Sequence, residues 1–439
     1  MRFETLQQWL AWQEQLHPCE IDLGLERVAK VYHQLCTSKP SQRIITVGGT
    51  NGKGSSVAML DAILRAAGYR VGSYTSPHLL KYNERIKIDG EPVDDPTLCQ
   101  AFERIDQARG ETSLSYFEFG TLAALDIFNQ ASLDVVILEV GLGGRLDAVN
   151  IVDADVALIT NIGLDHQAWL GDDLESIGFE KAGIMRAGRP VVFASANPPD
   201  SLVAHANNIG AVQYTFEQAY QYETNNSGWR WQSANRRREA LPMPSLRGDF
   251  QLKNAAGVLM VLESLRAQLP VTQTDIRRGL LGAKVVGRFQ IISTPVRQIL
   301  DVGHNPHAVE QLKINLQAIE CRGRTRAVFA MMGDKAISEV IHIIQPLIHD
   351  WYIGDLQLPR AATTAQLVPL LEEQGADSLH QFATVEEAYQ QALSDAGPAD
   401  QIVVFGSFFV IAAVMHEMER QTQQQDKEQQ WKIIASNNA

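Results

Sequence analysis

A run of glycines around one lysine offers the clearest chemistry in the chain. Residues 43–56 read RIITVGGTNGKGSS, an apolar stretch followed by four glycines, with Lys53 between the last two. Glycines let the backbone turn with its N–H groups inward, and the start of a helix adds partial positive charge. Such a bend can hold a polyphosphate, with Lys53 reaching its outer groups. These residues predict a nucleoside triphosphate site.

The match to the general phosphate-loop pattern is not literal. That pattern has four residues between its first glycine and Gly-Lys, followed by Ser or Thr. Here Gly48 and Gly52 bracket three residues, and Gly54 follows Lys53. The alternative is an ordinary strand-to-helix turn. The sequence Gly-Lys-Gly-Ser, with an apolar strand before it and an amphipathic helix after it, favours the phosphate loop.

Two further residues have types and positions suited to a metal ion. Glu139 lies within the apolar segment 135–140, where an ionised carboxylate is costly unless it is paired or binds a metal. We interpret it as a magnesium ligand near the triphosphate, with an ion pair to Arg145 as the alternative. His166 closely follows the segment 156–160 and can reach the same sheet edge, although magnesium prefers oxygen ligands to imidazole.

Lys181 lies in a segment whose apolar residues recur at helical spacing. It shares the apolar face with Ile177 and Ile184, and a buried amine has a depressed pKa and can be nucleophilic. Such a lysine can take up carbon dioxide as a carbamate, which exchanges a cation for an anion able to bind or orient magnesium. The alternative is a side chain that extends along the helix to solvent. The sequence leaves both interpretations open.

A second polar group follows a strand in the C-terminal part of the chain. Asp301, His304 and Asn305 come directly after the apolar segment 298–300. Their position at a strand end indicates that they face the cleft between two domains. For Asn305, which precedes a proline, a helix cap is an adequate structural interpretation. We expect Arg288, at the predicted domain boundary, to contact phosphate when the domains close.

The elements that position these residues follow an α/β pattern. A short apolar run at residues 44–47 predicts the first strand, and residues 69–74 are predicted to form the second. Continuous apolar runs, typical of parallel strands covered on both faces, occur at residues 135–140 and 156–160. A polar cluster, residues 75–78, follows the second strand, and open α/β sheets bind ligands at such strand ends. Residues 218–232 predict a hairpin or small β insert.

Two domains are expected, because 439 residues are too many for one core. We predict an α/β fold in which residues 1–288 form a phosphate-loop-containing, mostly parallel sheet domain with a small β insert. Residues 289–420 are predicted to form a smaller, Rossmann-like α/β domain, whose strands are expected at residues 298–302, 326–331, 351–353 and 402–405. The Gln-rich tail, residues 421–439, is predicted to be frayed or disordered.

Composition argues against several classes of function. The net charge of −13 argues against wide nucleic-acid binding, and the one basic cluster, residues 236–238, is interpreted as a solvated loop. The N-terminal residues are polar rather than signal-like, and the longest apolar stretch, residues 402–415, is shorter than the ~20 residues of a membrane span. We expect a cytoplasmic protein with no membrane contact. The four cysteines show no zinc or redox spacing.

Several segments, in this order and spacing, resemble a known family. They are GTNGKGS, SYTSPHL, YFEFGTLAAL, LDVVILEVGLGGRLDAVNIVDADVALIT, LDHQAWLG, EKAGI, GRFQ and DVGHNPHA. Together they are similar to the Mur ligase superfamily and, within it, to the bacterial dihydrofolate synthase/folylpolyglutamate synthases. The resemblance spans nearly the whole chain.

The resemblance implies an ATP-dependent amide ligase and gives roles to residues by position. ATP would be bound by Thr50, Asn51, Gly52, Lys53, Gly54, Ser55, Asn254, Arg288 and Asp301. Magnesium, as two ions, would be held by Ser76, Glu139 and His166. The pterin site would be lined by Ser115, Tyr116, Phe117, Glu118, Leu146 and Asp147. Catalytic roles would fall to Lys53, His166, His304 and Lys181, the last as a carbamylated lysine.

The expected reaction joins L-glutamate to 7,8-dihydropteroate and to tetrahydrofolate derivatives. A substrate carboxylate would attack the γ-phosphate of ATP, and the acyl phosphate would then react with the amine of glutamate. The alternatives are a ligase with only one of these activities and an ATP-binding switch protein without ligase chemistry. A cell-wall Mur ligase is disfavoured by Gly-Lys-Gly-Ser. We expect a monomer.

Three positions depart from the pattern of the superfamily. Residues 250–251, Phe-Gln, replace its usual His-Asn pair, although Asn254 is retained. Val286 stands where proline often precedes Gly-Arg-Phe. Residues 408–409 are both Phe where a histidine is expected, which weakens the case for a C-terminal histidine role but changes no predicted metal ligand.

Overall fold

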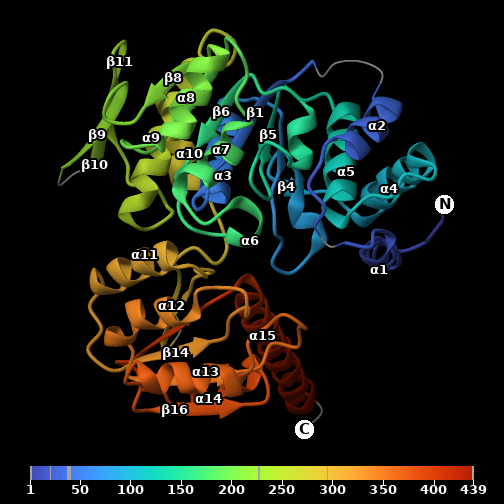
Figure 1. Cartoon of the computed structure of the whole chain (residues 1–439). Helices are drawn as coiled ribbons and strands as arrows, with labels where there is room; N and C mark the ends of the chain where they lie inside the picture. The colour runs from blue at the N-terminus through green and yellow to red at the C-terminus, as the bar shows by residue number, and fades with distance from the viewer. Residues whose placement is uncertain (1, 20, 37–40, 226–227, 294, 438–439) are drawn as a thin grey trace. The chain divides into compact units, whose positions relative to one another are not determined.

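The computed structural model describes residues 2–19, 21–36, 41–225, 228–293 and 295–437, with side chains described as far as residue 424. The chain divides into two compact units, Met1–Val285 and Val286–Ala439 (Figure 1). Each unit has its own large sheet and its own buried hydrophobic side chains.

The first unit is organised around a mostly parallel sheet. In sheet order, the strands among the described residues are β4 (Glu91–Pro92), β3 (Ile86–Ile88), β2 (Val71–Tyr74), β5 (Val135–Glu139), β1 (Arg43–Gly48), β6 (Val156–Ile159), β7 (Pro190–Phe193) and β8 (Val212–Thr215). Strands β3 and β4 form an antiparallel edge, and the other strands run parallel. Because β1 lies between β5 and β6, and β2 lies next to β5, the four strand ends of this sheet that lead to predicted site residues are neighbours.

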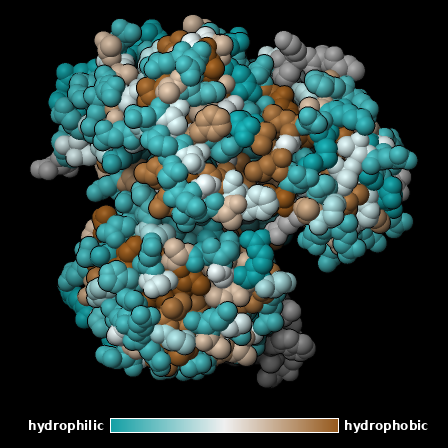
Figure 2. All heavy atoms as spheres, viewed as in Figure 1, coloured by the Kyte–Doolittle hydropathy of each residue, from teal (hydrophilic) through white to brown (hydrophobic). Residues whose placement is uncertain are grey.

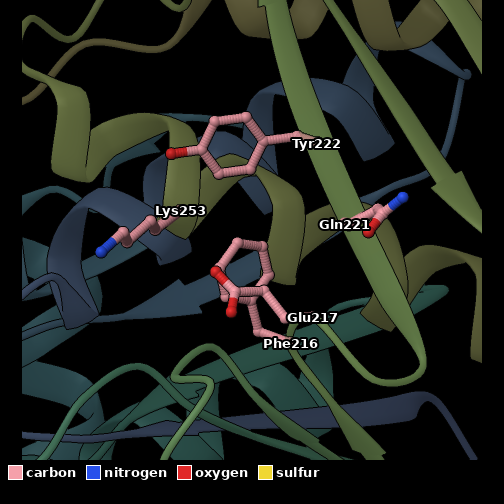
Figure 3. Close-up of a pocket in the computed structure, with 5 residues that line it drawn as sticks. All are labelled: Phe216, Glu217, Gln221, Tyr222 and Lys253. Atoms are coloured by element: carbon pink, nitrogen blue, oxygen red, sulfur yellow. The ribbon is translucent and has the colours of Figure 1, made fainter.

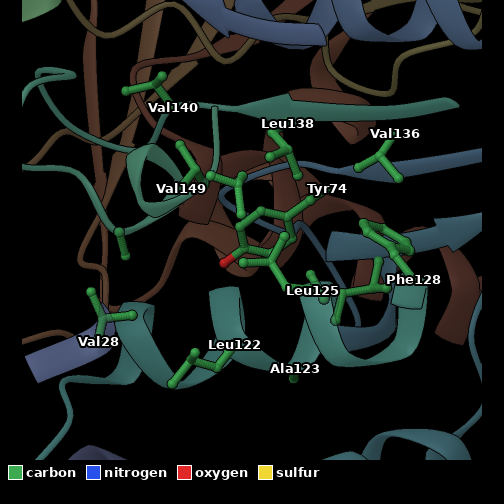
Figure 4. Close-up of a cluster of buried hydrophobic side chains, with 14 of the residues drawn as sticks. Val28, Tyr74, Leu122, Ala123, Leu125, Phe128, Val136, Leu138, Val140 and Val149 are labelled. Carbon is green, nitrogen blue, oxygen red and sulfur yellow. The ribbon is translucent and has the colours of Figure 1, made fainter. Parts of the chain in front are cut away.

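Helices cover both faces of this sheet. They are α1 (Leu6–Leu16), α2 (Glu26–Leu35), α3 (Lys53–Ala66), α4 (Asp95–Arg109), α5 (Tyr116–Gln130), α6 (Gln167–Leu170), α7 (Leu174–Ala182), α8 (Asp200–Ile209), α9 (Asp249–Ser264) and α10 (Gln273–Gly282), with short 3-10 turns at Tyr82–Arg85 and Ala148–Ile151. Successive side chains of a strand point to opposite faces, so Val136 belongs to one core cluster and Ile137 to the other. Figure 4 shows the first cluster, which contains Leu122 and Leu125 of α5 and Leu138 of β5.

A small antiparallel sheet forms the predicted β insert. It consists of β9 (Tyr220–Asn225), β10 (Gly228–Ser233) and β11 (Arg236–Leu241). The interpretation of residues 236–238 as a solvated loop is wrong, because they lie in β11 and Arg238 is buried beside Glu263 of α9. The tryptophans of β10 face the core. Strand β11, which local composition did not indicate, forms by pairing with β10.

The second unit is built on a six-stranded sheet within the described residues. In sheet order its strands are β12 (Gln290–Ser293), β13 (Arg297–Leu300), β17 (Gln401–Phe405), β14 (Thr325–Phe329), β15 (Asp350–Gly354) and β16 (Leu379–Phe382), with β12 antiparallel and the rest parallel. The helices are α11 (Pro306–Gln317), α12 (Ile337–Ile344), α13 (Thr364–Glu373), α14 (Val385–Asp395) and α15 (Phe408–Asn437), with a 3-10 turn at Gln345–Leu347. The two sheets and the β insert confirm the predicted fold class.

The C-terminal helix corrects one expectation. The Gln-rich segment after residue 420 is helical as far as Asn437 rather than disordered, and its Gln, Glu and Lys residues are good helix formers. Hydrophilic side chains cover much of the face seen in Figure 2. Among the described residues, no helix combines the length and the apolarity needed to cross a bilayer.

Candidate active site

The glycine-rich loop between β1 and α3 is held by residues that follow β6. The backbone N–H of Thr50 donates to the Asn161 carbonyl at 2.9 Å, and that of Asn51 donates to Asn161 Oδ1 at 2.8 Å. Thr160 Oγ1 donates to the Asn51 carbonyl at 2.7 Å. Thr50 Oγ1 accepts from the Gly163 N–H at 3.0 Å. The loop is therefore held in shape by hydrogen bonds from the residues that follow the neighbouring strand.

Two glycines of the loop make this close fit possible. Gly49 has φ +137°, and a Cβ there would lie 1.9 Å from Thr160 Oγ1. Gly52 has φ +86° at the N-cap of α3, and a Cβ there would lie 2.7 Å from Asn254 Oδ1. Only glycine adopts such backbone angles without strain and leaves room for these side chains.

Two lysines converge on one carbonyl of the loop. Lys53 Nζ donates to the Gly49 carbonyl at 3.1 Å, and Lys181 Nζ donates to the same oxygen at 3.0 Å. Lys181 is buried, with 5% of its surface exposed. Burial, with a further contribution from the charge of Lys53, lowers the pKa of its ammonium to about 7. The solvent-exposed alternative for Lys181 is therefore wrong, and the carbamate stays a prediction.

The carboxylate of Glu139, at the end of β5, faces the first turn of α3. A Cβ on Gly54 would lie 3.6 Å and 3.8 Å from its two oxygens. The backbone N–H of Ser76, which follows β2, donates to Glu139 Oε2 at 3.4 Å. Arg145, the alternative partner, forms an ion pair with Glu180 at 2.8 Å. Ser76 and Glu139 thus meet beside the predicted phosphate loop.

His166 lies on the segment that leaves β6 at the same edge of the sheet. It is exposed, has φ +53°, and is the N-cap residue of α6. Three residues earlier, Gly163 contacts Thr50 of the loop. In the part of the chain that is described, no group of three His, Cys, Asp or Glu side chains is arranged to hold a metal ion. The predicted set has only two such residues, with Ser76 as the third.

Helix α9 contributes two buried amides. Gln251 Nε2 donates to Ser55 Oγ at 3.1 Å, and Asn254 Nδ2 donates to Gln251 Oε1 at 3.1 Å. Asn254 also lies against Gly52. The two amide side chains therefore connect α9 to Gly52, at the end of the loop, and to Ser55, in the first turn of α3. From the sequence, Gln251 was noted only as a departure from the pattern of the superfamily. Its position one helical turn before Asn254 could have indicated that the two side chains lie on the same face of α9.

Two of the predicted pterin residues engage each other at the start of α5. Ser115 is the N-cap, and its backbone N–H donates to Glu118 Oε2 at 2.7 Å, while the Glu118 N–H donates to Ser115 Oγ at 3.3 Å. Arg27 Nη2 also donates to Glu118 Oε1 at 3.0 Å. This capping box satisfies the first turn of the helix and anchors α2 to it.

The two aromatic residues of this set have different neighbours. A Cβ on Gly141 would lie 2.6 Å from Phe117 Cζ, so the Phe117 ring packs directly on the backbone two residues after Glu139. The Arg85 guanidinium lies 5.6 Å from the centre of the Tyr116 ring. Both aromatic side chains are half-buried, which leaves part of each ring accessible.

Asp147 is buried and holds the loop after β5. Its carboxylate accepts from the N–H groups of Leu142 at 2.8 Å and Val149 at 3.0 Å. Burial raises the pKa of Asp147 to about 6, against the opposing effect of these hydrogen bonds. Leu146, the residue before it, is half-buried.

In the second unit, the residues after β13 form a tight turn. The N–H groups of Phe289 and Gly303 each donate to Asp301 at 2.8 Å. Burial raises the pKa of Asp301, while the nearby charge of Arg288 lowers it. His304 Nδ1 lies 2.9 Å from the Val302 carbonyl; because a carbonyl oxygen only accepts, this nitrogen carries the proton.

Asn305 is explained by helix capping. Its Oδ1 accepts from the backbone N–H of Ala308 at 2.9 Å at the start of α11. The helix-cap interpretation made for Asn305 is therefore confirmed.

A cavity of about 520 Å³ opens near the end of β8 (Figure 3). Its described lining consists of Phe216, Glu217, Gln221, Tyr222 and Lys253. The rings of Phe216 and Tyr222 stack with centroids 5.6 Å apart. This lining shares no residue with the predicted site, although Lys253 precedes Asn254 in α9.

Comparison with known proteins first defines the class. Residues 47–262 match the Mur ligase middle domain, and residues 287–408 match the Mur ligase glutamate ligase domain. The parallel sheet with its glycine-rich loop lies in the first match, and the turn that holds Arg288, Asp301 and His304 lies in the second. The fold is that of a Mur ligase, with both domains of that class in one chain.

Similar proteins then define the family. The dihydrofolate synthase/folylpolyglutamate synthase of Escherichia coli (strain K12) is 44% identical over 414 residues, which cover 94% of this chain and 96% of that protein. The chain belongs to the dihydrofolate synthase/folylpolyglutamate synthase family.

Solved structures agree with this assignment. A structure of E. coli FolC in complex with DHPP and ADP has a TM-score of 0.91 at 43% identity and covers 95% of this chain and 99% of that chain. A crystal structure of a bifunctional folylpolyglutamate synthase/dihydrofolate synthase with Mn, AMPPNP and L-glutamate bound has a TM-score of 0.88 at 46% identity, covering 95% and 98% of the two chains.

Proposed function

We propose that this protein is an ATP-dependent amide ligase that adds L-glutamate to 7,8-dihydropteroate and to tetrahydrofolate derivatives. The observation that carries this proposal is the meeting of Lys53, Lys181 and the Glu139 carboxylate around one preformed glycine-rich loop. Such a site can bind a triphosphate and stabilise the charge that develops when its outer phosphoryl group is transferred. We also propose that the protein acts in the cytoplasm as a monomer.

The nucleotide would be held mainly by the loop and by α9. Backbone N–H groups of residues 52–55 would face the phosphates, since α3 starts here and its N-terminus favours negative charge, while the N–H groups of Thr50 and Asn51 donate to Asn161 and hold the loop in shape. Lys53 would lie beside the γ-phosphate. Asn254 lies against Gly52 and would contact the nucleotide from the other side. Arg288 and Asp301 of the second unit are proposed as further ATP contacts.

Magnesium fits the donors that the structure brings together. The Glu139 carboxylate faces Gly54, and the backbone N–H of Ser76 donates to it; carboxylate and hydroxyl oxygens are ligands that magnesium accepts. We propose that Ser76, Glu139 and His166 hold two such ions. When bound, magnesium neutralises phosphate charge during phosphoryl transfer.

Lys181 is proposed to act as a carbamate. Its lowered pKa of about 7 leaves a large neutral fraction at neutral pH, and only a neutral amine reacts with carbon dioxide. The carbamate would replace a second ammonium beside Lys53 by an anion, and so remove the repulsion between the two lysines. It would then orient metal ligands near the loop.

The pterin end of the substrate is proposed to bind beside α5. Ser115 to Glu118, with Leu146 and Asp147, would line this site. The Phe117 ring lies over Gly141, and offers a planar surface on which a pterin can stack. This arrangement would direct the far end of the substrate, its carboxylate, toward Glu139 and the loop.

The reaction would proceed in two steps. The substrate carboxylate attacks the γ-phosphorus, the bond to the β–γ bridging oxygen breaks, and ADP leaves while Lys53 stabilises the charge. The neutral amine of L-glutamate then attacks the acyl carbon, phosphate leaves, and the nitrogen gives up a proton to form the amide. His304, whose Nδ1 carries a proton, presents Nε2 as a proton acceptor when the ring is neutral, and is proposed to lie near the glutamate amine.

ADP release tests the proposal directly. The purified chain is given ATP, magnesium and either 7,8-dihydropteroate or tetrahydrofolate, with and without L-glutamate. We expect ADP release that depends on glutamate with both substrates, and its loss in Lys53→Ala. Release with one substrate only would indicate a monofunctional ligase, and release that ignores glutamate would indicate a nucleotide switch.

A further inference from the structure

The side chain of Phe408 lies between two residues to which the proposed function gives roles. The Arg288 guanidinium carbon is 5.4 Å from the centre of the Phe408 ring. The His304 ring is 6.0 Å from it, tilted by 52°. Phe408 is half-buried, so one part of the ring packs on the unit and another part is accessible.

The backbone around all three residues is fixed by hydrogen bonds. Arg288 is flanked by two of them, from the Phe289 N–H to Asp301 Oδ2 and from the Val302 N–H to the Gly287 carbonyl, both 2.8 Å long. The Gly406 N–H donates to the Gly303 carbonyl at 3.1 Å, which joins the ends of β17 and β13. The start of α15 is capped by Ser407, whose Oγ accepts from the Val410 N–H at 3.1 Å.

A fixed backbone does not by itself fix the direction of the long Arg288 side chain, whose charge also acts on Asp301. Four flexible torsions separate its guanidinium from the main chain, and ordering such a side chain costs conformational entropy. An aromatic face attracts a guanidinium and limits the directions it can take. The Phe408 ring supplies that aromatic face to Arg288. The same ring also gives the His304 imidazole an apolar surface to pack against.

We propose that Phe408 is a positioning residue that orients Arg288 and His304 for ATP binding and for amide formation. The inference rests on the proposed function, and the ring belongs to the Phe-Phe pair, residues 408–409, in which a histidine is expected. A histidine here would become a cation at low pH and repel Arg288, whereas a phenyl ring attracts the guanidinium at every pH.

Nucleotide affinity gives the first test, with AMPPNP as the probe and isothermal titration calorimetry as the measurement. Phe408→Leu keeps an apolar side chain and removes the ring, and we expect it to raise the AMPPNP dissociation constant about two- to fivefold, the range of a partly exposed cation–π contact. Phe408→Tyr should restore the value of the unmodified protein. The matched control is Phe382→Leu, which removes a half-buried ring from β16 at the opposite edge of the same sheet and should change nothing.

A double mutant separates positioning from general packing. In an Arg288→Ala background, Phe408→Leu should have no further effect on AMPPNP affinity, because the residue through which the ring acts is gone. A ring that merely packs would weaken affinity equally in both backgrounds, which would overturn the proposal. So would an AMPPNP dissociation constant that Phe408→Leu leaves unchanged.

A titratable replacement gives an independent signature should Phe408→Leu fail to fold. For Phe408→His, the ratio of its dissociation constant to that of the unmodified protein should be larger at pH 5.5 than at pH 8, because the imidazolium repels Arg288. A ratio that does not depend on pH contradicts the proposal. If the unmodified protein shows no glutamate-dependent ADP release, the proposed function fails; if it does and these affinities do not move, only the role of Phe408 fails.

Discussion

At the scale of single residues, the site is defined by two ammonium groups that share the Gly49 carbonyl. Lys53 and Lys181 donate to this oxygen at 3.1 Å and 3.0 Å. Two cations so close are unfavourable unless an anion such as a phosphate lies beside them, or one of the two amines is converted to a carbamate. The arrangement is therefore one that favours binding a polyanion.

The buried charge of Lys181 predicts a dependence of stability on pH. Its pKa falls from 10.5 to about 7 on folding, so between these values the unfolded chain binds one more proton and the folded state gains about 1.4 kcal/mol for each unit rise in pH. Lys181→Met removes this slope and should be more stable than the unmodified protein near pH 7, by an amount that shrinks toward pH 9. Urea unfolding in CO₂-free buffer measures it. Parallel stability curves for the two proteins would contradict the burial of a low-pKa amine.

The loop glycines predict a difference between two alanine substitutions. Gly49→Ala would place a Cβ 1.9 Å from Thr160 Oγ1 at φ +137°, and should cost about 3 kcal/mol of unfolding free energy or more. Gly188→Ala also requires a positive φ, +67°, but meets open space, and should cost about 1 kcal/mol. Chemical denaturation compares them. Equal losses would mean that the contact between the loop and Thr160 is not tight.

At the scale of elements, continuous apolar runs were reliable guides. Residues 135–140 and 156–160 were predicted as buried parallel strands and correspond to β5 and β6, because a strand covered on both faces needs apolar side chains at every position. The change from this pattern to glycines and then to helical spacing likewise located β1, the loop and α3.

Elements held by distant contacts were not predictable in this way. Strand β11 reads as polar, with three arginines in succession, and is a strand because it pairs with β10. The hydrogen bonds of Thr160 and Asn161 to the loop join residues about 110 positions apart, so no local sequence pattern predicts them. The same holds for Gln251, whose amide reaches Ser55 across the core.

At the start of α5, substitution of Ser115 can distinguish its role in helix capping from its proposed role in pterin binding. Ser115→Ala removes the capping box and should cost about 1 kcal/mol of unfolding free energy. Thr272→Ala removes a similar capping box from α10 and is the matched control, with a similar loss. If Ser115 also contacts the pterin, only its substitution should raise the KM for 7,8-dihydropteroate. Equal KM values in the two variants would restrict Ser115 to a structural role.

At the scale of the whole molecule, the chain is two compact units joined near residue 285. Each unit matches a separate part of the Mur ligases, residues 47–262 and 287–408. The candidate phosphate site lies in the first unit, and the turn of Arg288, Asp301 and His304 lies in the second. The loop residues proposed to bind phosphate and His304, proposed to lie near the glutamate amine, therefore belong to different units.

The junction predicts where a protease acts first. Lys284 is exposed and lies between α10 and β12 in a stretch without helix or strand. Brief trypsin treatment of the folded protein should cleave there first and leave two fragments that correspond to the two units. Mass spectrometry identifies the cut, and Lys284→Gln should prevent it. A first cut within either sheet would contradict the division into units.

The transfer of oxygen from the substrate to phosphate tests the central claim most directly. 7,8-Dihydropteroate labelled with ¹⁸O in its carboxylate is incubated with the protein, ATP, magnesium and L-glutamate, and the released phosphate is examined by mass spectrometry. If the carboxylate is activated as an acyl phosphate at the glycine-rich loop, each phosphate formed carries one ¹⁸O atom from the substrate. Phosphate that contains no label, released at the same rate as the amide forms, would contradict this account.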